Sequence, residues 1–179
     1  MRVFKIDATD LTWLSGPEDD PHDLCLHGHA TAIIGGTVLE DTATVSTTAL
    51  HLLKSLTEDH IPGHPPESQM LPCCGHSLIP NDDLSEVYIC GCPNGIYWTV
   101  RHEGDHVRLI LESGQETVVP LSAYKAEVFR FADKVEAYYH SCAPKILPVK
   151  EDDLDRLGYI AFWNEWQRRY NDGLMLLSL

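Results

Sequence analysis

Apolar and polar residues alternate in several short stretches of this chain, which is the pattern of β-strands with one buried face. The clearest stretches are 96–102 and 105–112, which flank the turn signal Glu103-Gly104. A two-residue turn there would put the apolar partners on one face and the polar residues on the other. The expected apolar pairs are Val100 with Val107, Trp98 with Leu109, and Ile96 with Leu111.

Further strand-like segments lie on both sides of this hairpin. Residues 87–92 precede it and residues 115–120 follow it, so we expect an antiparallel meander of roughly four or five strands. Residues 3–6 and 23–39 also have β-strand character. Within the latter, Gly35-Gly36 suits a tight hairpin turn, because glycine readily adopts positive φ.

Other segments repeat apolar residues every three or four positions, which indicates helices. The expected helices cover residues 46–60, 122–142 and 153–170. Ser46 and Ser122 are suitable N-caps, and Gly173 lies just beyond the expected end of the last helix.

Together these elements predict an α+β fold. We expect an antiparallel β-meander sheet with helices packed on one face and with two C-terminal helices. Residues 1–179 are expected to form a single domain. The alternative is a subdivision at the Pro-rich loop 61–69.

The charge balance narrows the classes of function. Thirteen Lys and Arg against 27 Asp and Glu give a formal net charge of −14. This excess of negative charge argues against nucleic-acid binding and against a polybasic membrane anchor. No apolar run approaches the ~20 residues that span a bilayer, and the first residues lack the apolar core of a signal peptide. We therefore expect a cytoplasmic protein whose cysteines are reduced.

Cysteine and histidine gather in Cys73-Cys74-Gly75-His76 and again in Cys90-Gly91-Cys92. If the two segments pair around Asp83, Cys74 faces Cys92 and His76 faces Cys90. Three thiolates and one imidazole form a known structural zinc set, so the candidate ligands are Cys74, His76, Cys90 and Cys92. No other cofactor is predicted.

Two other interpretations of these cysteines remain open. They can be small apolar core residues, because Leu78, Tyr88 and Trp98 share their expected face. Alternatively, one of them can be a redox or catalytic thiol.

A second candidate metal site lies at Cys25, His27 and His29, which share one face of an expected strand. A thiol and two imidazoles occur in metalloenzymes together with further ligands, so a metal-dependent hydrolase is one hypothesis. The alternative is a polar strand face, since the sequence does not identify the remaining ligands. Phosphate-binding loops, dinucleotide fingerprints and nucleophile elbows are absent from the sequence.

The acidic clusters at 18–23, 82–86 and 151–155 have two interpretations. They can be solvated loops and helix caps that keep the chain soluble, or they can form a face that attracts a basic protein partner, because complementary charge speeds association. Tyr159, Trp163, Trp166 and Tyr170 form an aromatic stripe that is either core or an interface anchor. The leading hypothesis is a non-enzymatic protein-binding module of the immunity or inhibitor kind. A structural-zinc regulatory or scaffold domain is the alternative, and the oligomeric state is left open. The candidate partner-binding residues are Asp19, Asp20, Asp82, Asp83, Glu86, Trp163 and Trp166.

Overall fold

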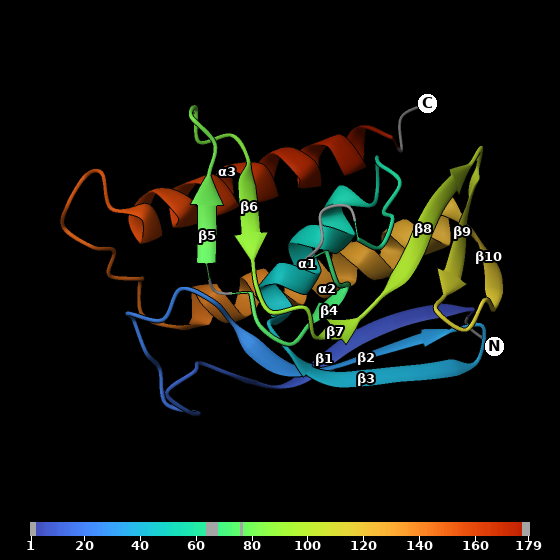
Figure 1. Cartoon of the computed structure of the whole chain (residues 1–179), viewed down its shortest axis with the longest axis horizontal. Coiled ribbons are helices and arrows are strands. Elements are labelled where there is room, and N and C mark those ends of the chain that lie inside the picture. Colours follow the sequence, from blue (N-terminus) through green and yellow to red (C-terminus); the bar gives the residue numbers. More distant parts are fainter. Residues whose placement is uncertain (1–2, 64–67, 76, 177–179) are drawn as a thin grey trace.

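The fold combines small antiparallel sheets with three helices, which confirms the predicted α+β class (Figure 1). The computed structural model describes residues 3–63, 68–75 and 77–176. Two of the helices lie near the C-terminus, as expected. Among the described residues, no helix is both long enough and apolar enough to cross a membrane.

The first sheet has the strand order β1-β2-β3, and helices pack on it (Figure 1). Its turn lies at Gly35-Gly36, where both glycines have positive φ and Ile34 pairs with Thr37, so the predicted hairpin is confirmed. Helices α1 and α2 pack on β2 and β1 respectively. The strands are β1 (Phe4–Thr12), β2 (His27–Ile34) and β3 (Thr37–Ala43), and the helices are α1 (Val45–Lys54), α2 (Leu121–Ser141) and α3 (Leu154–Met175).

The second sheet contains β8 (Trp98–Glu103), β9 (His106–Leu111) and β10 (Glu116–Pro120). Its first turn lies at Gly104-Asp105, so Trp98 pairs with Leu111 and Val100 pairs with Leu109. The predicted partners were wrong by two residues. The predicted buried face is nevertheless correct, because a shift of two residues keeps every side chain on its side of the strand. Trp98, Val100, Val107 and Leu109 are all fully buried.

The remaining strands do not extend this meander. They form two short pairs, β4 (Leu71–Pro72) with β7 (Gly95–Ile96) and β5 (Ser77–Pro80) with β6 (Val87–Cys90). The β5–β6 hairpin lies against α3 (Figure 1). The two backbones approach so closely that a Cβ on Gly158 would lie 2.0 Å from the carbonyl oxygen of Leu78.

The helix ends differ from the predicted ones. Ser46 lies inside α1, and its Oγ accepts a hydrogen bond from Leu26 N at 3.1 Å instead of capping the helix. Ser122 lies in the first turn of α2, which follows Pro120. Gly173 is inside α3, where it packs on Leu56 and Phe129. For Ser46 and Gly173 a tertiary contact determined the role of a small residue.

Candidate functional site

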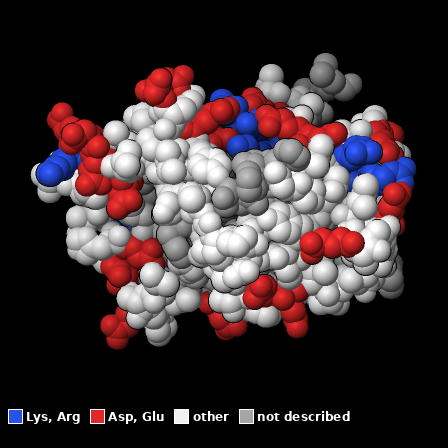
Figure 2. Space-filling model, in the orientation of Figure 1, with Lys and Arg blue, Asp and Glu red and all other residues white. Residues whose placement is uncertain are grey.

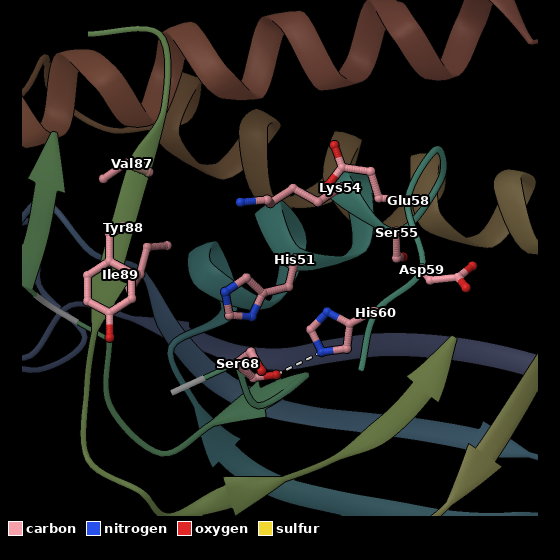
Figure 3. A pocket seen from close by; sticks show the side chains of 10 residues that line it. All are labelled: His51, Lys54, Ser55, Glu58, Asp59, His60, Ser68, Val87, Tyr88 and Ile89. Carbon is pink, nitrogen blue, oxygen red and sulfur yellow. Dashed lines mark hydrogen bonds between the residues drawn. The ribbon is translucent and has the colours of Figure 1, made fainter. Parts of the chain in front are cut away.

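A cleft lies between α1, the segment that follows it, and strand β6 (Figure 3). Its volume is about 180 Å³. Helix α1 contributes His51 and Lys54, which are three positions apart and so lie on the same helix face. His60 is held by an antiparallel bridge to β8, with both backbone hydrogen bonds to Val100 at 2.8 and 2.9 Å.

Two imidazoles form the floor of this cleft, with ring centroids 5.9 Å apart. His51 Nδ1 lies 2.8 Å from the carbonyl oxygen of Gln69, and His60 Nε2 lies 2.8 Å from that of Ser68. Because a carbonyl oxygen only accepts, each of these nitrogens carries the proton and donates it. The other nitrogens, His51 Nε2 and His60 Nδ1, are therefore hydrogen-bond acceptors.

Burial keeps both imidazoles neutral. It lowers the pKa of His51 to about 3, with a smaller contribution from the neighbouring His60. Burial likewise lowers the pKa of His60. Near pH 7 both rings therefore present a lone pair instead of a positive charge.

The cations around the cleft already have carboxylate partners. Lys54 Nζ lies 3.2 Å from Glu165, which is fully buried, and Arg169 bonds Glu58. Asp59 differs: it accepts a hydrogen bond from the backbone of His102 at 2.8 Å and makes no ion pair within the described part of the chain.

One further polar group is buried at the edge of the cleft. Ser68 is 3% exposed, and its Oγ has no hydrogen-bond partner among the described residues. On the opposite side, β6 supplies the buried side chains of Val87 and Ile89 and the exposed ring of Tyr88. The cleft thus combines hydrogen-bond acceptors with an apolar wall, which suits an alkyl chain that ends in a cationic donor.

The predicted acidic residues do not form one patch. Asp82, Asp83 and Glu86 are exposed in the β5–β6 hairpin, whose strand β6 forms the wall of the cleft. Asp19 and Asp20 lie in a different loop, which bonds residues 143 and 145 just after α2. Figure 2 shows acidic side chains mainly around the edge of the visible face, with a largely uncharged centre.

The two aromatic residues predicted as interface anchors, Trp163 and Trp166, differ in exposure. Trp166 is fully buried, so it is part of the core and is not accessible to a partner. Trp163 is half-buried and lines a second hollow of about 360 Å³ between α2 and α3. Tyr139 meets the Trp163 ring edge-on there, with ring centroids 5.1 Å apart.

The predicted zinc rectangle is not formed as expected. Ser77 pairs with Cys90, so the predicted register is wrong by one residue, and His76 lies outside the described residues. Cys90 shares the outer face of β6 with Tyr88, which is 40% exposed. Of the residues predicted to share one core face, Leu78 and Trp98 are therefore buried, whereas Tyr88 and Cys90 lie on the outside. In the described ranges, no group of three or more Cys, His, Asp or Glu side chains is arranged to hold a metal ion.

The second predicted metal site, at Cys25, His27 and His29, is likewise not a metal-binding group among the described residues. Cys25 is buried, and burial raises the pKa of its thiol to about 12, with Asp23 and Asp155 contributing. His27 is buried as well, whereas His29 is partly exposed with Nε2 3.7 Å from Glu40. The strand places the two histidines on one face, but it does not assemble a ligand set around them.

Sequence reasoning missed the central residues of the cleft. His51 and Lys54 are three apart in the otherwise apolar second half of α1, and this spacing was the one available signal. Comparison with protein families, with curated proteins and with solved structures finds no match to this chain.

Proposed function

We propose that this protein binds a basic protein partner and receives a lysine or arginine side chain of that partner in the cleft between α1 and β6. The observation that carries the proposal is the pair of neutral imidazoles whose tautomers leave two acceptor nitrogens on the cleft floor. The proposal places the protein among non-enzymatic binding modules of the immunity or inhibitor kind.

The charges around the cleft favour a cationic guest. Lys54 and Arg169 are each engaged with carboxylates, whereas Asp59 carries a negative charge that no described cation neutralises. Asp59 lines the same cleft with its carboxylate directed away from the two rings (Figure 3), so it would attract an arginine or lysine by its charge while the imidazoles accept the hydrogen bonds of that side chain. Its alkyl stem would lie along the wall of β6, next to Tyr88.

The exposed acidic hairpin would assist the encounter. Asp82 and Asp83 lie at its tip, beside the strand that forms the cleft wall. Exposed charges of this kind speed association and are screened by salt, since the Debye length is about 8 Å at physiological ionic strength. Binding should therefore weaken as salt is added.

The same geometry favours binding over catalysis. An efficient proton-transfer group has a pKa near the working pH, whereas burial holds the pKa of His51 at about 3. The Nδ1 of His51 and the Nε2 of His60 are engaged by backbone carbonyls and not by a hydroxyl or thiol nucleophile.

A short arginine peptide tests the proposal without knowledge of the partner. We would titrate acetyl-Gly-Arg-Gly-amide into ¹⁵N-labelled protein and follow the signals of His51, His60 and Tyr88. A dissociation constant on the order of 1 mM, or about −4 kcal/mol, is reasonable for one side chain. The matched peptide with norleucine in place of arginine should not bind.

Two single substitutions test whether the arginine peptide binds in this cleft. Asp59→Asn keeps the oxygen that accepts from His102 but removes the charge, so it should weaken arginine-peptide binding about tenfold, or about 1.4 kcal/mol. Glu112→Gln removes an exposed carboxylate of the β9–β10 turn and should have no effect. Equal binding by the two variants, or shifts confined to other surfaces, would exclude this cleft as the cation site.

A further inference from the structure

A group of thiols lies beside the cleft, outside the proposed cation site. The segment after β4 and the segment before β7 meet there, and Cys73 N donates to Asn94 O at 3.2 Å. The backbones are so close that a Cβ on Gly91 would lie 2.3 Å from the carbonyl oxygen of Cys74. Residues 17 to 21 positions apart in the sequence therefore contact one another directly.

The closest of these contacts joins Cys74 and Cys92. The backbone N–H of Cys92 donates to Cys74 Sγ at 2.8 Å. The thiol of Cys92 donates to the carbonyl oxygen of Asn94 at 3.9 Å, and the neighbouring Cys74 thiol is the main cause of a lowered pKa of Cys92. Since Cys92 Sγ is separated from its own backbone nitrogen by only two carbons, the two sulfurs are within reach of a bond by side-chain rotation.

These sulfurs are also accessible. Cys74 and Cys92 are partly exposed, in contrast to Cys25, which is buried in the core. Cys90 is partly exposed too, but it is held opposite Ser77 on the outer face of the β5–β6 hairpin. Proximity and access, the two requirements of a reactive thiol pair, are met by Cys74 and Cys92 together.

We propose that Cys74 and Cys92 form a disulfide when a hydroperoxide oxidises the protein, and that a dithiol reverses it. The Cys92 thiolate attacks the peroxide, so that an S–O bond forms, the O–O bond breaks and the other oxygen leaves as an alcohol or water. The Cys74 thiolate then attacks the resulting sulfenic acid, the S–S bond forms and water leaves. Two electrons pass from the sulfurs to the peroxide, and the two thiol protons end on its oxygens.

The disulfide would lie next to the cleft floor. Gln69 Nε2 donates to the carbonyl oxygen of Cys92 at 3.2 Å, and the carbonyl of the same Gln69 accepts from His51. The thiol pair is thus two hydrogen bonds away from one of the imidazoles. The proposal itself does not depend on the proposed function of the cleft.

The test is oxidation of the whole chain with one equivalent of hydrogen peroxide, followed by intact-mass measurement and peptide mapping. We expect the loss of two hydrogen atoms, a cross-linked peptide that joins Cys74 to Cys92, and full reversal by dithiothreitol. Cys142→Ser, at the end of α2, should behave in the same way. In Cys74→Ser, dimedone should trap a sulfenic acid on Cys92.

Three outcomes would overturn the proposal. One is a cross-link between other cysteines in the unmodified chain. Another is conversion of Cys92 to sulfinic acid without any disulfide. The third is stoichiometric zinc in the purified protein, measured by elemental analysis, that protects these thiols from peroxide until a chelator removes it.

Discussion

Replacement of His51 by asparagine tests whether the cleft holds a neutral imidazole. The asparagine Nδ2 can take the place of His51 Nδ1 and donate to the Gln69 carbonyl, but it does not titrate. The half-buried ring of His51 has its pKa lowered from 6.5 to about 3, mainly by desolvation. The variant therefore removes a pH-dependent contribution to stability while it keeps the hydrogen bond.

Proton linkage gives the sign and the size of the pH-dependent change in the free energy of unfolding. Below pH 6.5 the unfolded chain binds a proton at His51, whereas the folded chain does not until the pH approaches 3, so acid stabilises the unfolded state. The free energy of unfolding falls by at most about 1.4 kcal/mol per pH unit in this range. Between about pH 7.5 and about pH 4.5 the contribution of His51 to the free energy of unfolding is at most about 2.7 kcal/mol, and it is lost as the pH falls.

Urea unfolding at a series of pH values measures this contribution. The wild-type protein should lose stability more steeply than His51→Asn between these pH values, and the comparison of slopes removes any uniform effect of the substitution. His140→Asn, at an exposed position of α2, should keep the wild-type slope. Equal slopes for His51→Asn and the wild type would refute the assignment of a neutral imidazole.

Three further predictions concern stability and can be measured by chemical unfolding at constant pH. Gly158→Ala would press a Cβ onto the Leu78 carbonyl, where α3 meets β5, and should cost about 1–3 kcal/mol, whereas Asn171→Ala on an exposed part of α3 should change little. Tyr139→Phe removes a buried hydroxyl that donates to Leu24 O at 2.8 Å and accepts from Leu26 N at 3.1 Å, so it should cost about 1–3 kcal/mol; a loss below 0.5 kcal/mol would contradict this pairing. Glu165→Ala leaves Arg169 and the Val87 N–H without their buried acceptor and should cost about 3–5 kcal/mol, and unchanged stability would show that solvent replaces the carboxylate.

Hairpin turns were only partly predictable from the local sequence. Gly35-Gly36 fixed its hairpin because both positions need positive φ. In the β5–β6 hairpin the loop spans six residues, 81–86. Leu84 in this loop has a positive φ of 59°, which is uncommon for leucine and is not predicted by the residue type. Asn81 accepts from Glu86 N in this loop, and the resulting shape shifted the register by one residue from the predicted one.

Alternation in the sequence determined which side chains of β8 and β9 are buried, as Trp98, Val100 and Val107 show, because burial follows the period of a strand. The sequence also determined the excess negative charge and the α+β class. The site was decided by tertiary structure. His51 and His60 acquire their tautomers from the carbonyls of Gln69 and Ser68, and every residue has such a carbonyl, so no sequence pattern marks the one that a folded chain brings to a histidine.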